Sequence, residues 1–508
     1  MSSHLNFAKT LKGLPLIIQI FGLACGLMFV IAAYASVTDV FREARIFFYT
    51  GLTGILFLSL VVLCTTNRDL KETGVLQLLS LILSFLLLPI FCAFPTWVIL
   101  PNVNLMDAYL DMVGAFTTTG LTVFEEEALS QPIHLWRALV AWFGGGLILI
   151  AAFVILLPVN LGGFEVFSNK SNSLNPNRKL TLDERSMTWI KVSQKLIPVY
   201  LGLTVTLWVF LTSLGTDGYT SLIRALSVIS TSGISGPENF ALDGAGFFGE
   251  LLIVIFLFFA LSHNILRSFF KQFKLKNFLS DAEIRLGLFL ALSVTLLLSF
   301  EQLILDNFYS INGQLFGNVF ELIWGNFFTV VSFITTNGYV SSFWEFPSSS
   351  RDLPYTVIVL MGLCLFGGGV ATTAGGIKLL RISILFSTFS NETGKLLHPS
   401  SIAGKNNLSK VQGTSVFMAW IFFMLFMVSI AALTIFLAMF EIRFEDALVL
   451  AVACLTTTGP FIEMAGPEKI LISGLSVFSK MALVVGMILG RLEILVVLSL
   501  ITFGFKRP

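Results

Sequence analysis

Four short stretches with one shared pattern decide the fold of this chain. They read DAYLDMVGAFTTTGLT (107–122), TSLIRALSVISTSGIS (220–235), GNFFTVVSFITTNGYV (325–340) and DALVLAVACLTTTGPF (446–461). In each, a half-length apolar helix is expected to run into residues rich in Thr and Ser and then into a glycine. A single copy could be an ordinary turn after a membrane helix, but four copies in phase indicate an internal repeat.

The composition indicates a membrane protein. Of 508 residues, 56% are hydrophobic and 12% are charged, and the mean hydropathy is +0.88. A helix needs about 20 apolar residues to cross the bilayer, and we expect about ten such helices, some of them joined from shorter pieces. The predicted spans cover 14–36, 47–64, 75–99, 136–158, 194–214, 247–266, 286–305, 354–366, 414–440 and 471–503.

The repeat also predicts how the chain is organised. Each of the four stretches has one apolar helix before it and one after it, so the unit is helix, half-helix with loop, helix. We therefore predict an all-α integral membrane fold with four pseudo-symmetric units around one central pore. Residues 1–70 form an additional N-terminal pair of helices, and the units occupy 71–165, 166–275, 276–395 and 396–508.

The loops after the half-helices have the chemistry of a cation site. Non-helical backbone at membrane depth is tolerated only where it is buried in protein or lines a wet cavity. Each half-helix would aim the negative end of its dipole at the pore, and the loop carbonyls would replace a cation's hydration shell. Glycine suits the last position because an inward-facing carbonyl requires backbone angles that a Cβ opposes. The predicted filter residues are Thr118, Thr119, Gly120, Thr231, Ser232, Gly233, Thr336, Asn337, Gly338, Thr457, Thr458 and Gly459.

The distribution of charge favours a cation and argues against nucleic acid. The net charge is +1, and no basic stretch is interleaved with stacking aromatics. The connection 100–135 lacks Lys and Arg but carries Asp107, Asp111 and the acidic run 125–127, so a negative outer mouth is expected. Asp107 and Asp446 occupy the same place before their glycines, and we interpret them as half-helix caps. Basic residues concentrate in alternate loops, which predicts an N-terminus on the cytoplasmic side.

These residues resemble the TrkH/KtrB superfamily of bacterial potassium transporters, whose plant relatives are the HKT transporters. Besides the four loops, the similar stretches are WFGGGLILIAAFVILLPVNLGGFEVF (142–167), FGGGVATTAGGIKLLR (366–381) and MILGRLEIL (487–495). The resemblance runs from residue 70 to the end. The two additional N-terminal helices make the chain more similar to the TrkH branch than to the shorter KtrB branch.

The resemblance implies K⁺ uptake across the inner, cytoplasmic membrane of a bacterium. It also implies a homodimer with one pore per subunit, a cytoplasmic nucleotide-binding regulatory subunit of the TrkA/KtrA kind, K⁺ as the permeant ion and no organic cofactor. In the family, glycine at all four filter positions goes with K⁺ preference. This chain has all four glycines, but Ser232 and Asn337 depart from the family pattern, which leaves the selectivity among K⁺, Rb⁺ and Na⁺ open.

A gate is predicted in the third unit. Glycines interrupt the helix after the third loop, and their poor helix propensity predicts a loop that crosses the pore just inside the filter, where the resembling family has its gating loop. Arg491 is a costly charge in the last apolar helix, and we expect it to bond with carbonyls of this loop. Snorkelling of Arg491 to the inner surface is the alternative. The predicted gate residues are Gly367, Gly368, Gly369, Gly375, Gly376, Lys378 and Arg491.

Other functions are less consistent with the sequence. An enzyme is not expected, because GxxxxGK[ST], HExxH and GxSxG patterns are absent and the four His are scattered. A carrier with inverted halves would show paired broken helices rather than four units of the same sense. Whether the pore is a gated channel or a carrier coupled to an H⁺ or Na⁺ gradient, including one that moves Na⁺ or both Na⁺ and K⁺, stays open.

Overall fold

The computed structural model describes residues 16–65, 74–124, 129–156, 182–236, 246–261, 281–305, 315–344, 355–397, 413–464 and 470–493. Within these ranges the chain is all helical and contains no strand, as the composition predicts. The acidic run 125–127 and most of the predicted inner loops 159–193 and 264–285 lie outside the described residues.

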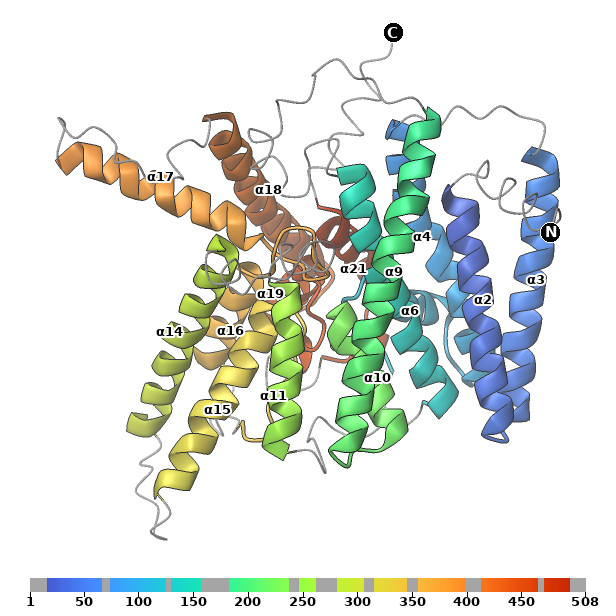
Figure 1. The fold of residues 1–508 in the computed structure, drawn as a ribbon, viewed down its shortest axis with the longest axis horizontal. Helices are drawn as coiled ribbons and strands as arrows, with labels where there is room; N and C mark the ends of the chain where they lie inside the picture. Colours follow the sequence, from blue (N-terminus) through green and yellow to red (C-terminus); the bar gives the residue numbers. More distant parts are fainter. Residues whose placement is uncertain are drawn as a thin grey trace.

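The helices follow the order expected from the repeat (Figure 1). The N-terminal pair is α2 (Leu16–Val37) and α3 (Phe41–Thr65). Next come α4 (Gly74–Ile99), α5 (Leu105–Phe116) and α6 (Gln131–Ala151) with a π-helical end η2 (Ala152–Leu156), then α9 (Leu182–Ser213), α10 (Gly218–Ser230) and α11 (Gly246–Leu257) with a 3₁₀ turn η4 (Phe258–Ala260). The third predicted unit holds α14 (Ala282–Leu305), α15 (Leu315–Ile334), α16 (Tyr355–Leu365) and α17 (Leu379–Leu397). The fourth holds α18 (Gly413–Ala438), α19 (Phe444–Thr456), α20 (Phe461–Met464), η5 (Ile472–Gly474) and α21 (Val477–Leu492).

Seven helices among the described residues are long and apolar enough to span a membrane. They begin or end within a few residues of the predicted spans, except that α3 begins earlier and α9 extends towards its N-terminus. Shorter apolar helices stand at the other predicted spans in units two and three. The chain is therefore a multi-pass membrane protein.

The half-helices form the interior of the bundle. α5, α10 and α19 have 12, 13 and 13 residues, too few to cross the hydrocarbon core. Apart from their first two residues and Leu222, all residues of α5 and α10 are buried, although both helices carry polar side chains. The helix before the third predicted loop, α15, is 20 residues long and so does not match the prediction of a half-length helix.

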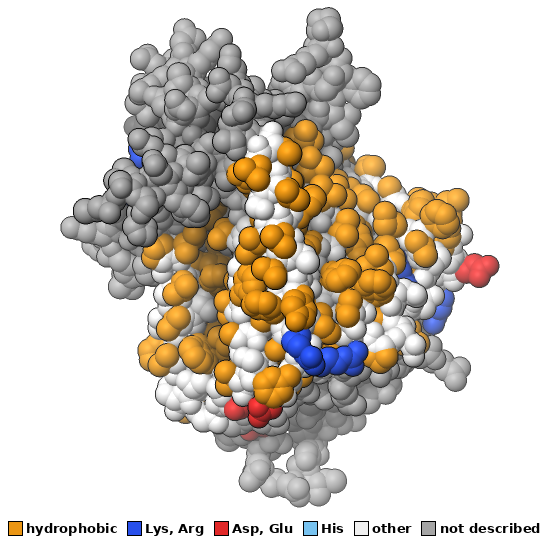
Figure 2. Space-filling model, turned by 90° about the vertical axis from the view of Figure 1, so that its right-hand side faces the viewer, with side chains coloured by type: hydrophobic (Ala, Val, Ile, Leu, Met, Phe, Trp, Pro, Cys, Tyr) orange, Lys and Arg blue, Asp and Glu red, His pale blue; other side chains and the backbone are white. Residues whose placement is uncertain are grey.

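The outer surface of the bundle is apolar. α2 packs on α3, α4 and α6, at the end of the molecule opposite to α14 and α17 (Figure 1). Figure 2 shows this end covered largely by apolar side chains, with a few charged groups near one edge. Exposed residues here include Leu23, Val30, Phe57 and Leu60. Such a surface is stable against lipid rather than water.

Candidate ion filter and gate

The four predicted filter loops share one backbone conformation. We define them as loop 1 (118–120), loop 2 (231–233), loop 3 (336–338) and loop 4 (457–459). Each begins with a threonine in the left-handed region, where residues with a Cβ are uncommon. The φ angles are 55° at Thr118, 53° at Thr231, 56° at Thr336 and 56° at Thr457. The sequence repeat is therefore also a repeat of an uncommon backbone geometry.

Three of the four glycines also lie in the left-handed region. Their φ angles are 67° at Gly120, 66° at Gly233 and 80° at Gly338. Gly459 has a negative φ. It precedes Pro460, whose ring restricts the preceding residue to extended conformations. Loop 4 therefore differs from the other three loops, which the shared glycine did not predict.

The loops contact one another in chain order and close into a ring. A Cβ at any of the four glycines would lie close to the neighbouring loop. The Cβ position of Gly120 is 1.8 Å from the Ser232 carbonyl oxygen, and that of Gly233 is 2.1 Å from the Asn337 carbonyl oxygen. The Cβ position of Gly338 is 3.0 Å from Pro460 Cβ, and that of Gly459 is 2.5 Å from the Thr119 carbonyl oxygen. Four segments far apart in the sequence thus meet, with a backbone oxygen at three of the four contacts and the Pro460 ring at the fourth.

Hydroxyl groups support three of the loops from within. Thr119 bonds with Thr117 at 2.8 Å. Ser232 accepts from Ser230 at 3.2 Å, and Thr458 accepts from Thr456 at 3.2 Å. These contacts support the loops without adding a formal charge, so the partial negative charge at the loops comes from their carbonyl and hydroxyl oxygens.

Two buried ion pairs anchor the first half-helix. Asp107 Oδ1 lies 2.5 Å from Lys480 Nζ on α21, and Asp111 Oδ1 lies 3.0 Å from Arg137 on α6. Arg137 also donates to the Leu121 carbonyl oxygen at 3.2 Å, directly after loop 1. Buried charges need such partners because desolvation is costly. The sequence presented Asp107 as part of a negative mouth and as a helix cap, and Asp111 as part of that mouth, but it did not indicate ion pairs for them. The basic residues inside apolar helices were the signal that could have identified their partners.

The proposed capping role of the aspartates is wrong. Asn104 occupies the N-cap of α5 and Arg443 that of α19, so Asp107 and Asp446 lie in the first turns instead. In α10 the N-cap is Asp217, whose carboxylate accepts from the N–H groups of Tyr219 and Thr220.

A buried carboxylate that sequence reasoning missed holds the segment after loop 3. Glu250 of α11 is fully buried and accepts from Trp324 Nε1 at 2.7 Å. It also accepts from the Ser342 N–H at 2.7 Å and from the Ser341 and Ser342 hydroxyls. One carboxylate thus joins α11, α15 and the chain leaving loop 3. The only signal in the sequence was a glutamate inside an apolar helix.

The glycine-rich segment of unit three is a loop, as its helix propensity predicts. α16 ends at Leu365 and α17 begins at Leu379, and we call the residues between them (366–378) the gating loop. Its Gly368 N–H donates to the Ile334 carbonyl at 3.0 Å, and its Gly375 N–H donates to Thr336 Oγ1 at 2.8 Å. A Cβ built on Gly375 would lie 2.2 Å from the Thr456 carbonyl oxygen. The loop therefore lies directly against loops 3 and 4.

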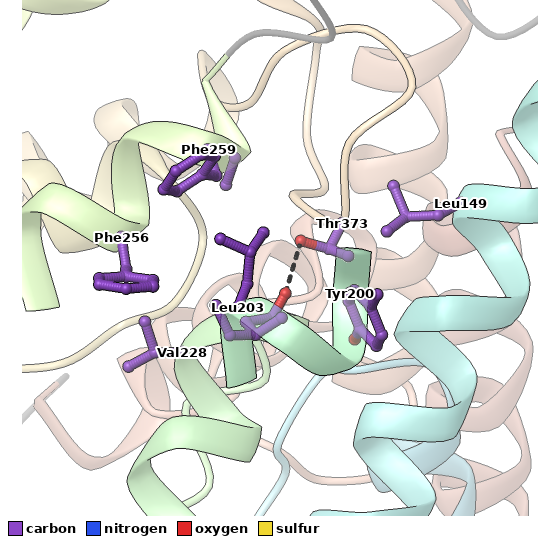
Figure 3. Close-up of a pocket in the computed structure, with 9 residues that line it drawn as sticks. Leu149, Tyr200, Leu203, Val228, Phe256, Phe259 and Thr373 are labelled. Atoms are coloured by element: carbon purple, nitrogen blue, oxygen red, sulfur yellow. Dashed lines mark hydrogen bonds between the residues drawn. The ribbon is translucent and has the colours of Figure 1, made fainter. Parts of the chain in front are cut away.

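The gating loop also contacts the second unit and α14. Thr373 Oγ1 donates to the Ile229 carbonyl at 3.4 Å, at the edge of a small, mostly apolar cavity that includes Leu149, Tyr200 and Phe259 (Figure 3). The Val370 N–H donates to Glu283 Oε1 at 3.0 Å. A backbone carbonyl of the second predicted unit and a carboxylate of the third thus also bond with the gating loop.

Charged residues surround the inner side of this loop. Arg491 donates to the Thr373 carbonyl, so the predicted bond between Arg491 and the gating loop is present. Glu493, the C-cap of α21, pairs with Arg381 at 2.8 Å. Lys378 Nζ donates to the Ala374 carbonyl at 2.6 Å. Arg491, Lys378, Glu493 and loop residues also line one small cavity. The structure therefore brings together all the residues predicted for the gate.

Known proteins match this chain over most of its length. The potassium uptake protein TrkG of Escherichia coli is 26% identical over 84% of both chains, and E. coli TrkH is 26% identical over 80% of both. TrkI of Halomonas elongata is 26% identical over 84% of this chain and 82% of its own length.

The fold and the family agree with these relatives. The crystal structure of the potassium transporter TrkH from Vibrio parahaemolyticus superimposes with a TM-score of 0.80 at 21% identity, over 98% of this chain and 99% of that one. The family model described as TrkH, cation transport protein, matches residues 240–504, which is more than half of the chain. The resemblance noted in the sequence is thereby confirmed, and the chain belongs to the TrkH family of cation transport proteins.

Proposed function

We propose that this chain takes up K⁺ across the cytoplasmic membrane of a bacterium through a selective, gated pore. The observation that carries the proposal is the ring of loops 1 to 4, in which glycines and backbone oxygens of four distant segments meet. Backbone carbonyls without formal charge suit a monovalent cation that must bind and leave quickly. The potassium uptake proteins named TrkG, TrkH and TrkI are similar to this chain over most of its length, which supports K⁺ as the ion.

In this proposal the gating loop and Arg491 close the pore inside the filter. The loop is held by hydrogen bonds to Ile334 and Thr336 at one side and by Arg491 at another. The guanidinium adds a positive charge below the filter, which opposes the passage of a cation. Opening then requires the bond between Arg491 and Thr373 to break.

The proposed assembly is a homodimer with one pore in each subunit and a cytoplasmic nucleotide-binding partner of the TrkA kind. Positive inner loops are the proposed docking region for that partner. Neutralising Lys271, Lys274 and Lys276 together should weaken nucleotide-dependent regulation while membrane insertion stays normal. Lost insertion would instead assign these charges to topology.

Growth and ion flux test the proposed function directly. A bacterium without K⁺ uptake systems should grow on low K⁺ when it expresses this chain with a nucleotide-binding partner. Purified protein in liposomes should take up radioactive Rb⁺, and unlabelled K⁺ should compete better than Na⁺. Uptake measured under imposed pH and Na⁺ gradients separates a channel from a coupled carrier. Equal competition by K⁺ and Na⁺, with normal protein insertion, would contradict K⁺ as the selected ion.

A further inference from the structure

The four filter glycines divide into two kinds by the partner of their N–H group. Gly120 N–H donates to the Gly114 carbonyl at 3.0 Å, and Gly338 N–H donates to the Ser332 carbonyl at 3.3 Å. Both acceptors belong to the helix that leads into the same loop. Gly459 N–H instead donates to the Thr119 carbonyl of loop 1 at 2.6 Å. Gly233 N–H donates to a side chain, Oδ1 of Asn337 in loop 3, at 3.2 Å. Loops 2 and 4 are thus each tied to a neighbour.

Asn337 differs from the residues at the same place in the other loops. Thr119, Ser232 and Thr458 also precede a filter glycine, and their hydroxyls bond inside their own loops. Asn337 is the member of this set whose side chain reaches the neighbouring loop. Its side chain is longer by one heavy atom, and its amide oxygen can only accept. The asparagine in loop 3 therefore makes a contact with loop 2 that the shorter Ser or Thr side chain would not make.

The surroundings of Asn337 leave little freedom for this contact. Asn337 is fully buried, and its own N–H donates to the Ser332 carbonyl at 3.0 Å. Because its Oδ1 must face the Gly233 N–H, its Nδ2 faces away. Among the described residues Nδ2 has no hydrogen-bond partner. A buried amide with half of its hydrogen-bonding capacity unused is unfavourable for folding, so packing alone does not explain why this position holds an asparagine.

We propose that Asn337 is a specificity-determining residue, which fixes loop 2 against loop 3 through the Gly233 N–H and thereby sets the preference among monovalent cations. The inference rests on the proposed function and deepens it. The Gly233 position is already tight, because a Cβ built there would lie 2.1 Å from the Asn337 carbonyl oxygen. The tether thus acts where the backbone oxygen of loop 3 faces loop 2. Without it, the two loops separate and the oxygens fit a given cation less closely.

Three substitutions of one residue test this proposal in liposome flux. Asn337→Leu keeps the size of the side chain and removes the acceptor, and Asn337→Thr introduces the hydroxyl found in loops 1 and 4. Both should lower the ratio of K⁺ to Na⁺ competition against Rb⁺ uptake by about two- to tenfold, as expected for one neutral hydrogen bond. Asn337→Asp retains an oxygen at the same place and should keep more of the ratio than Asn337→Leu does.

Asn326 provides a matched control on α15, the helix that leads into loop 3. It is also buried, and its Nδ2 donates to Ser299 Oγ at 2.9 Å and to Gln302 Oε1 at 2.8 Å, which joins α15 to α14 away from the loops. Asn326→Leu should reduce the amount of inserted protein but leave the competition ratio unchanged. The ratio is measured on the molecules that transport, so a lower yield does not affect it.

The outcomes separate this inference from the proposed function. Normal wild-type uptake together with unchanged ratios in Asn337→Leu and Asn337→Thr would overturn the inference alone. The same follows if Asn326→Leu shifts the ratio as much, or if Asn337→Asp loses as much as Asn337→Leu. If neither Leu nor Thr yields inserted protein, the ratio of Asn337→Asp decides, since a loss of tenfold or more overturns the tether. An inactive wild-type protein would refute the proposed function and this inference with it.

Discussion

Replacing Gly120 by alanine should damage ion selectivity far more than the same change at Gly338. At Gly120 the new Cβ would lie 1.8 Å from the Ser232 carbonyl oxygen, although real Cβ contacts essentially never fall below 3.0 Å. Loops 1 and 2 must therefore move apart by at least the 1.2 Å difference between these two distances. The φ of 67° adds roughly 1–2 kcal/mol of strain for a residue with a Cβ. At Gly338 the nearest atom is already 3.0 Å away.

The expected effect is a loss of K⁺ uptake of about tenfold or more for Gly120→Ala, since 1.4 kcal/mol corresponds to a factor of ten. The K⁺ over Na⁺ preference should fall as well, and Gly120→Ser should behave alike. Gly338→Ala has the strain of its φ of 80° but almost no clash, so its loss should be smaller. Gly362→Ala in α16 is the matched control, because nothing lies within 4 Å of its Cβ position.

Ion-competed Rb⁺ uptake in liposomes, normalised to inserted protein, measures both flux and preference. The loss of K⁺ uptake should be larger for Gly120→Ala than for Gly338→Ala, and Gly362→Ala should leave uptake unchanged. If Gly120→Ala and Gly338→Ala had equal effects, the contacts between loops 1 and 2 would not govern transport. Unchanged selectivity at all four filter glycines would remove the filter assignment.

Three further predictions concern the groups around the filter. Arg491→Ala should raise K⁺ flux and weaken its dependence on the nucleotide-binding partner. Unchanged open probability in single-channel recordings, with normal expression, would contradict the proposed role of Arg491 in closing the pore. Lys480→Met leaves Asp107 buried without its cation, so thermal unfolding should occur at a lower temperature, with a loss of stability of about 3–5 kcal/mol. The double variant Asp107→Asn with Lys480→Met should recover part of this stability. No recovery would show that the lost ion pair is not the cause of the destabilisation. Glu250→Ala should alter the ratio of K⁺ to Na⁺ competition because it releases the segment after loop 3, and Glu250→Gln should alter it less. If both variants have the same ratio as the wild type, Glu250 contributes to packing alone.

The sequence predicted well those features that repeat or that have a large energetic cost at membrane depth. The four loops were found because the same residues recur in phase. The break at the gating loop followed from glycines that a membrane helix disfavours. The bond from Arg491 to this loop was predicted because a charge in lipid must find a partner.

Features that depend on a distant partner were not predictable. Glu250 and the acceptors of Gly233 and Gly459 involve residues far apart in sequence, and each contact is fixed by packing rather than by spacing. Asp107 was misassigned because an acid near a helix start fits both an N-cap and an ion pair. Asn104, three residues earlier, occupies the cap instead.

The hydrogen bond from Gly375 to Thr336 joins the gating loop directly to loop 3. Since Thr336 is held in an uncommon backbone conformation, its geometry depends in part on where the gating loop stands. Through this contact, the position of the gating loop and the binding of an ion at loop 3 would share a coupling free energy. Such a coupling acts equally in both directions. If moving the gating loop changes the ion affinity of loop 3 by some factor, then binding of the ion changes the equilibrium between the positions of the gating loop by the same factor. In the proposed gating mechanism, the transported ion would then be an effector of its own gate, and the external K⁺ concentration alone would bias the resting position of the gating loop.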